Sequence, residues 1–299
     1  MSAGAAGRPP SSAQSSPFRD VWTLGLMAVL TCVLASCSTQ APSPRPTQTS
    51  TQAPGKRLTW MLTRAGLAQV LTDPAARSRL DGAPLYEILR TGQSPLGEAG
   101  AVPVVTFSAL GELEQAVSGG GLPTGTRAVL YDPEAWAFTP AAEQRNPARA
   151  ARQALHLAHA HGLRLIVAPA LNLTTVRPTS GPRWRQFLDL GLAGAMAKVA
   201  DVIELQAQSL ERDTSSYAAF VRTAARQARA ANPKVTVLAG LSTNPPGIAV
   251  TSQQLTAAIR ATSGMVSGYW LNIPGRGPRC PTCNAPRPDL AQQILRDLP

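Results

Sequence analysis

From Arg57 onward, short apolar runs rich in β-branched residues alternate with longer segments whose apolar positions recur every three or four residues. The first pattern predicts buried strands and the second predicts amphipathic helices, an order typical of a parallel sheet wrapped by helices. Seven runs are predicted strands: 58–63, 102–107, 127–132, 163–170, 201–207, 234–241 and 266–272. An eighth candidate covers residues 84–89, but only a dozen residues follow it before the next strand, which is short for a helical crossover.

Three of the segments between these strands carry clear helix signals. Pro147 begins a helix over residues 148–161, residues 215–231 end before an Asn-Pro pair, and a third helix covers residues 252–262. The chain therefore predicts a (β/α)8 TIM-like barrel if residues 84–89 form a strand, and an irregular or seven-stranded barrel if they do not. A doubly wound open sheet is the alternative, but no glycine-rich nucleotide-binding loop follows any predicted strand.

The N-terminal part of the chain follows a different pattern. Arginines precede an apolar run at residues 21–35, which is shorter than the ~20 residues of a membrane span and is typical of a secretory signal core. The run ends in L-A-S-C at residues 34–37, which resembles the bacterial lipobox. The resemblance implies that residues 1–36 are a lipoprotein signal peptide and that Cys37 is acylated; a plain secretory signal with an incidental cysteine is the alternative.

Residues 37–56 are rich in Ser, Thr, Pro and Gln and hold almost no apolar residue. Such a segment buries too little surface to offset the entropy cost of ordering, so we expect a disordered tether before a barrel domain at residues 57–299. Acyl chains such as palmitate anchor by burying methylene groups in the bilayer. The prediction is an exported bacterial lipoprotein whose membrane partner is reached through the lipid anchor, on the extracytoplasmic face of the cell membrane.

The charge and the remaining cysteines exclude other classes of protein. The net charge of +11 comes from arginines spread along the chain, which indicates an evenly basic surface and no nucleic-acid partner. Cys280 and Cys283 form a single C-x-x-C, whereas a zinc site needs four ligands. A redox motif is expected near the start of a βαβ unit rather than in a Pro/Gly-rich C-terminal loop. We therefore favour a structural disulfide in an exported protein.

The three histidines lie together in one predicted helix. His156 and His159 share a face of that helix, but His161 points about 200° away from His159, so the three cannot converge on one ion. We predict no metal, no cofactor and no Ser-His-Asp arrangement, and we expect a monomer.

A barrel places its active site at the carboxyl ends of its strands. Those ends carry carboxylates, carboxamides and aromatic rings, which is the composition of a carbohydrate site. The candidates are Tyr131, Asp132, Glu134, Trp136, Asn172, Glu204, Gln206, Gln208, Asn244, Trp270 and Asn272.

Alternation along the strand at residues 201–207 places Glu204, Gln206 and Gln208 on one face and apolar residues on the other, which would pack on helices. The polar face is predicted to point into the barrel, where its groups need partners. Two purely structural interpretations stay open. The three polar residues form a satisfied network in the barrel core, or Asp132 closes an Asp-Pro turn and leaves Glu134 in solvent.

The same strand ends resemble those of a known enzyme family. With residues 84–89 counted, Y-D-P-E at 131–134 ends the fourth strand, where chitinase-like glycoside hydrolases of family 18 carry D-x-E. The segments at 201–208, 237–241 and 268–272 resemble that family's sixth, seventh and last strands, and the resemblance covers roughly residues 127–275. It departs upstream of Asp132, where Ala128 and Leu130 stand in place of two further acids of the family motif.

The resemblance implies a role for each matching residue. Glu134 would be the general acid, and Asp132 would stabilise a positively charged intermediate formed by the substrate's own N-acetyl group. Trp270 would lie under the sugar and share a sugar-sized hollow with the acidic pair, and Gln206 would hydrogen-bond the sugar. An ordinary two-carboxylate mechanism with Glu134 and Glu204 is the alternative. Further rings that would stack on the sugar are Tyr131 and Trp136.

The sequence thus predicts a membrane-anchored, glycoside-hydrolase-like barrel that acts on N-acetylated glycans. The alternative is a catalytically inactive barrel that binds an envelope glycan or a protein.

Overall fold

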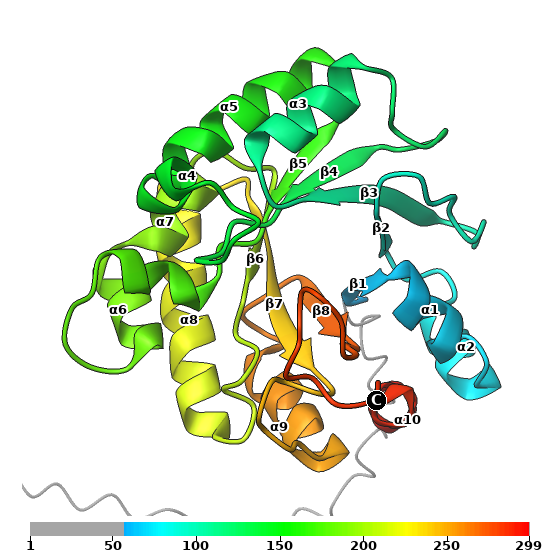
Figure 1. Ribbon diagram of the computed structural model, residues 1–299. Coiled ribbons are helices and arrows are strands. Elements are labelled where there is room, and N and C mark those ends of the chain that lie inside the picture. Colours follow the sequence, from blue (N-terminus) through cyan, green and yellow to red (C-terminus); the bar gives the residue numbers. More distant parts are fainter. Residues whose placement is uncertain (1–56, 299) are drawn as a thin grey trace, which may run out of the picture. The chain divides into compact units, whose positions relative to one another are not determined.

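Eight parallel strands close into a barrel in the computed structural model, which describes residues 57–298 (Figure 1). Each strand pairs with the next in chain order, and the last strand pairs with the first. The strands are β1 Thr59–Thr63, β2 Leu85–Leu89, β3 Ala101–Phe107, β4 Ala128–Tyr131, β5 Arg164–Val167, β6 Val202–Leu205, β7 Thr236–Ser242 and β8 Gly268–Asn272. The predicted (β/α)8 fold is confirmed, and the weakly supported strand β2 completes the ring. The predicted signal peptide, Cys37 and the tether lie outside the described residues.

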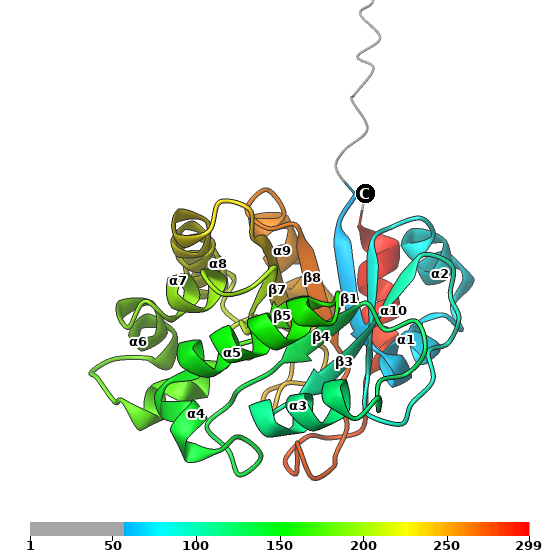
Figure 2. The ribbon, with the colours of Figure 1, turned by 90° about the horizontal axis from the view of Figure 1, so that it is seen from above.

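Helices cover the outside of the barrel. They are α1 Arg64–Val70, α2 Pro74–Leu80, α3 Leu110–Ser118, α4 Ala141–Arg145, α5 Pro147–Ala160, the 3-10 helix η1 Leu171–Val176, α6 Arg183–Asp189, α7 Leu192–Ala197, α8 Thr214–Ala231, α9 Ser252–Thr262 and α10 Pro288–Asp297. The three helices predicted from end signals correspond to α5, α8 and α9. Helix α10 packs against α1 and α2, so the end of the described chain lies beside its beginning (Figure 2). No helix within residues 57–298 has the length and hydropathy needed to cross a membrane.

Polar side chains fix where the long helices begin. Asn146 lies one residue before Pro147, which opens α5. Its side chain accepts a hydrogen bond from the N–H of Arg149. Asp213 caps α8 in the same way, and Thr251 and Gln254 form a capping box at the start of α9. Between β2 and β3, residues 90–100 form no helix, which explains the short connection seen in the sequence.

Two apolar layers hold the barrel together. Outward-facing strand residues pack against the helices, and Ile203, Leu205 and Ala207 of the β6 segment belong to this outer layer, as alternation predicts. A smaller inner cluster fills the barrel itself. Its members are Met61, Tyr86, Ile88, Val104, Ala128, Leu130, Ile166, Ala168, Val202, Leu238 and Trp270. Because this cluster fills the interior, the inward-facing polar groups gather at the carboxyl ends of the strands.

The loop between β8 and α10 is fastened at several points. A disulfide joins Cys280 to Cys283. The side-chain nitrogen of Asn244 donates to the backbone carbonyls of Pro274, Asn284 and Ala285, at 3.1, 3.1 and 3.2 Å. The loop is thereby held over the end of β7.

Candidate active site

Asp132 lies immediately after β4 and is held from the end of β6. Its side chain is only 7% exposed. Its Oδ1 accepts a hydrogen bond of 2.6 Å from Nε2 of Gln206, and the same nitrogen donates to the carbonyl of Ala168 at 2.8 Å. The Gln206 amide, expected to bind a sugar, therefore donates both of its hydrogens to protein acceptors and fixes the orientation of the Asp132 carboxylate.

Glu134 is half-buried, and its carboxylate also has a defined partner. Its Oε2 accepts a hydrogen bond of 3.1 Å from Nδ2 of Asn172, and Oδ1 of Asn172 accepts from the N–H of Ala135 at 2.9 Å. The N–H of Glu134 donates to Oγ1 of Thr139 at 3.2 Å. Asn172, expected among the sugar ligands, thus positions Glu134, and this carboxylate does not stand free in solvent as a plain Asp-Pro turn would leave it.

Glu204 is the third carboxyl of the group and is fully buried on the inward face of β6. Neither of its oxygens accepts a hydrogen bond from any residue in the described part of the chain. Room for it comes from Gly240 on β7, where a Cβ would lie 2.5 Å from Oε1 of Glu204 and 2.5 Å from Oε1 of Gln208. The absence of a side chain at position 240 therefore allows both groups to extend across the strand.

Burial raises the pKa of all three carboxyls. For Asp132, the negative charge of Glu134 adds to the effect of burial, and the positive charge of Arg279 opposes it. For Glu134, the hydrogen bond from Asn172 and then Arg279 lower the pKa against the effect of burial. For Glu204, burial and the charges of the other two acids all raise the pKa well above its usual range. Because neighbouring carboxylates resist joint ionisation, this group favours holding protons.

Arg279 supplies the positive charge at this site, and the strand ends gave no sign of it because it belongs to the loop after β8. Its Nη1 donates to Oγ of Ser108 at 2.9 Å. Its guanidinium lies 5.5 Å from the ring centroid of Trp136 and 5.3 Å from that of Phe138. Phe138 is 39% exposed, and the two rings meet edge to face at 5.1 Å. Arginine and aromatic rings thus form a rim beside the acids.

Trp270 belongs to the cluster that fills the barrel interior. On β8 it is the register partner of Gly240 on the neighbouring strand β7. It is only 8% exposed, so its ring face is largely covered and cannot serve as the open stacking floor that we expected. Its indole Nε1 is buried and donates to no acceptor within residues 57–298, and Oε1 of Gln208 likewise has no partner there. Oε1 of Gln208 and Oε1 of Glu204 both lie beside Gly240, so two buried oxygens without a hydrogen-bond donor among the described residues share this part of the barrel mouth.

Two of the expected sugar-binding residues have structural roles instead. Tyr131 faces outward, fully buried in the layer between sheet and helices, and its hydroxyl donates to Oε2 of Glu143 at 2.8 Å. The stacking role predicted for it is therefore wrong, because alternation turns it away from the side that Asp132 faces. Asn244 is buried and fastens the C-terminal loop through its amide nitrogen, so the prediction of a sugar ligand is wrong there too.

The remaining candidates lie where the sequence placed them, with different surroundings. Asn272 is half-buried at the end of β8, beside the last residue of β7. Trp136 is half-buried on the rim, and its Nε1 donates to Oγ1 of Thr139 at 2.9 Å.

His159 lies far along α5, and its Nε2 is 3.0 Å from Oδ2 of Asp201, which precedes β6 at the opposite end of the barrel.

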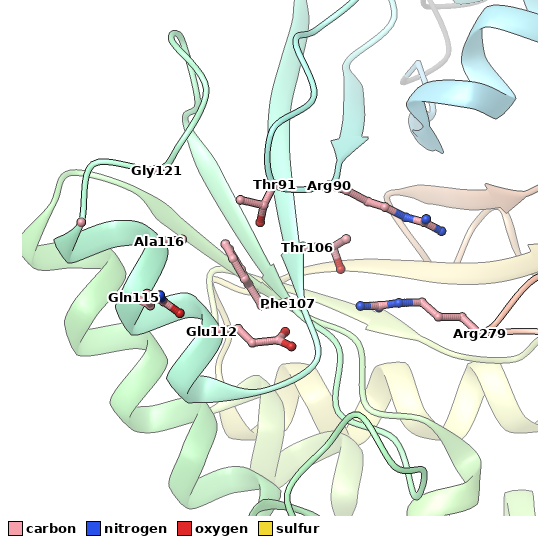
Figure 3. A pocket seen from close by; sticks show the side chains of 10 residues that line it. Arg90, Thr91, Thr106, Phe107, Glu112, Gln115, Ala116, Gly121 and Arg279 are labelled. Atoms are coloured by element: carbon pink, nitrogen blue, oxygen red, sulfur yellow. The ribbon is translucent and has the colours of Figure 1, made fainter.

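A hollow of about 610 Å³ adjoins the acids at the ends of β2 and β3 (Figure 3). Its lining includes Arg90, Thr106 and Glu112, and it also includes Arg279, which connects it to the acidic group. Neither Glu134 nor Trp270 lines it, so this is not the shared hollow expected from the sequence. The open space lies to one side of the acids.

The sequence matches no family model and no curated protein at a significant level. Among solved structures, a GH128 (subgroup III) curdlan-specific exo-beta-1,3-glucanase from Blastomyces gilchristii is similar with a TM-score of 0.44 at 12% identity, covering 82% of this chain and 100% of that one. A chitinase from Chromobacterium violaceum gives 0.45 at 10% identity, covering 81% and 100%. A sugar phosphate isomerase/epimerase from Parabacteroides distasonis gives 0.32 at 10%, covering 85% and 96%. Barrels of this kind carry many chemistries, so the function must be argued from the side chains.

Proposed function

We propose that the barrel mouth hydrolyses an N-acetylated glycan, with Glu134 as the general acid. The observation that carries the proposal is the group of three carboxyls, Asp132, Glu134 and Glu204, whose pKa values are all raised at the carboxyl ends of the strands. A carboxyl with a raised pKa keeps its proton to higher pH than an ordinary glutamate does and can deliver it to a leaving oxygen. Glu134 is the half-exposed member of the group, so it is the one that a substrate can reach.

Asp132 would then support a substrate-assisted reaction. Glu134 protonates the glycosidic oxygen, the bond from that oxygen to C1 breaks, and the acetamide oxygen of the same sugar forms a bond to C1. The positive charge of this intermediate lies beside the Asp132 carboxylate, which Gln206 orients. Water then adds to C1 as the bond from C1 to the acetamide oxygen breaks and the acetamide re-forms, and this water gives a proton to the ionised Glu134, which restores the acid.

The two-carboxylate alternative is disfavoured by the state of Glu204. A nucleophile must be ionised, but Glu204 is fully buried, has no hydrogen-bond donor within residues 57–298, and lies near two other acids. All three conditions favour its neutral form. A neutral Glu204 suits a role as a hydrogen-bond donor to the substrate better than a role as a nucleophile.

A binding-only barrel is the second candidate, and one observation favours it. The side chains below Asp132 on β4 are Ala128 and Leu130, which belong to the apolar inner cluster. No second carboxylate therefore supports Asp132 from beneath, and its ionisation depends on Gln206 and Arg279.

Glu134→Gln in the full-length chain distinguishes the two candidates. The substrates are chitotetraose and a tetrasaccharide of alternating N-acetylglucosamine and N-acetylmuramic acid, with new reducing ends measured. Glutamine keeps an oxygen for the Asn172 amide but cannot donate a proton as an acid, so we expect kcat to fall at least about a hundredfold while binding persists. Glu114→Gln, at an exposed position on α3, is the control. Wild-type protein that binds these glycans and cleaves neither supports the binding-only barrel, whereas an active Glu134→Gln variant excludes Glu134 as the acid.

We also propose that Cys37 is acylated and tethers the barrel to the extracytoplasmic face of the membrane. The support is the L-A-S-C sequence and the polar segment that follows it. Cys37→Ser should move the protein from the membrane fraction to the soluble fraction and abolish labelling by radioactive palmitate. Unchanged fractionation and labelling would contradict the anchor.

A further inference from the structure

Two arginines face the hollow beside the acids. Arg90 directly follows β2, and Arg279 belongs to the loop after β8; both line the hollow, and their side chains run in opposite directions past one another, that of Arg279 toward Thr106 (Figure 3). The volume of about 610 Å³ lies within the usual range for small-molecule sites, roughly 300–1,000 Å³. The hollow is therefore large enough for a ligand and is lined by two cationic groups.

The guanidinium of Arg90 is available to a ligand. Among residues 57–298, it makes no hydrogen bond or ion pair; the backbone of Arg90 is engaged with Gln93, its N–H donating to Oε1 at 2.8 Å and its carbonyl accepting from the N–H at 3.0 Å. A guanidinium presents a planar set of donors that matches a carboxylate with two parallel hydrogen bonds. A free arginine at the edge of a hollow thus favours an anionic group there.

Arg279 is held in place and belongs to both the hollow and the acidic group. The hydrogen bond to Ser108 and the rings of Trp136 and Phe138 fix its position. The acid that faces the hollow is Glu112, whose Oε2 lies 3.4 Å from the N–H of Ser108 at the start of α3. Two positive charges against one negative charge leave the lining cationic.

We propose that this hollow is a subsite for a sugar that carries a carboxylate, next to the sugar that is cleaved. The substrate is then an acidic N-acetylated glycan, such as one with the lactyl carboxylate of N-acetylmuramic acid, in preference to neutral chitin. The reaction part rests on the function proposed above, whereas the binding part rests only on Arg90, Arg279 and the hollow.

Binding to the full-length Glu134→Gln protein, measured by calorimetry, tests the subsite without turnover. The three ligands are the alternating N-acetylglucosamine–N-acetylmuramic acid tetrasaccharide, the same compound with its carboxyls reduced to alcohols, and chitotetraose. Because hydrogen bonds between charged groups are stronger than those between neutral groups, the acidic tetrasaccharide should bind at least about tenfold more tightly than its reduced form. High salt should diminish this preference.

Variants at position 90 identify the source of the preference. In the same background, Arg90→Gln should bring the affinities for the acidic and reduced tetrasaccharides close together, and Arg90→Lys should retain part of the difference. Arg152→Gln, at an exposed position on α5, removes the same charge away from the hollow and should retain the full difference. Equal binding of the acidic and reduced ligands by the parent protein, or equal losses in Arg90→Gln and Arg152→Gln, would overturn the subsite.

Failure of the subsite and failure of the enzyme hypothesis give different results. Wild-type protein with an Arg90-dependent preference for the acidic ligand but without cleavage contradicts the hydrolase and leaves the subsite standing. Cleavage of chitotetraose without any preference for the acidic ligand supports the hydrolase and contradicts the subsite.

Discussion

Glu211 is a buried acid outside the candidate site, and it should make the stability of the barrel depend on pH. Its side chain is fully buried between β6 and α8. Its Oε1 accepts a hydrogen bond of 2.8 Å from the N–H of Ser242, while Oε2 has no partner within residues 57–298. Burial raises the pKa of Glu211 to about 7, although hydrogen bonds from three backbone N–H groups, including that of Ser242, oppose the shift.

The sign of the effect follows from proton binding in the two states. An unfolded glutamate has a pKa of 4.5, so between pH 4.5 and about 7 the unfolded chain releases a proton that the folded chain keeps. The folded state binds more protons in this window, and the free energy of unfolding therefore falls as pH rises. A pKa difference of about 2.5 at 1.36 kcal/mol per pH unit gives a loss of about 3 kcal/mol, complete above about pH 7.

Glu211→Gln removes this titration and keeps an oxygen for the N–H of Ser242. Any packing cost of the new amide is the same at every pH. The difference in unfolding free energy, variant minus wild type, should therefore be about 3 kcal/mol more favourable to the variant at pH 8 than at pH 4. Urea unfolding at both pH values measures the change, and Glu114→Gln on the exposed face of α3 is the control for net charge. A difference from wild type that is equal at pH 4 and pH 8 would refute the reasoning.

Two further predictions concern the site. Gly240→Ala places a methyl group 2.5 Å from Oε1 of Glu204, so urea unfolding should show that the free energy of unfolding falls by about 1–3 kcal/mol. Gly111→Ala is the control, because no atom lies within 4 Å of a Cβ built there. Equal effects of the two substitutions would contradict the crowding. Arg279→Gln removes a charge that lowers the pKa of Glu134, and a general acid acts in its protonated form. The basic limb of the pH profile of kcat/KM should therefore move to higher pH, and a limb that stays in place or moves lower would contradict the assignment.

The strands could be predicted because a closed parallel barrel buries both faces of each strand, which leaves continuous apolar runs in the sequence. The uncertain strand was β2, although Leu85–Leu89 is buried throughout. The sequence evidence for this strand is weak because residues 90–100, which follow it, cross to β3 without a helix. A rule that expects a helix after every strand therefore weakened a correct prediction.

The carboxyls of the site could be located from the sequence because the fold brings every strand end to one mouth. Alternation could also have excluded Tyr131, since its neighbour Asp132 faces inward. The roles of Asn172 and Gln206 could not be foreseen, because either amide can bind a ligand or a carboxylate. Arg279 lies in a loop whose path depends on tertiary contacts, and no local pattern places it near Glu134.

The disulfide between Cys280 and Cys283 closes the loop segment that begins right after Arg279. Such a bond persists in oxidising compartments and is broken where glutathione keeps thiols reduced. Without the disulfide, the loop would still be fastened by the three hydrogen bonds from Asn244, and Arg279 would still contact Ser108 and two aromatic rings. The disulfide restricts the segment next to Arg279, so the placement of the charge that lowers the pKa of Asp132 and Glu134 is coupled to the oxidation state of the two cysteines.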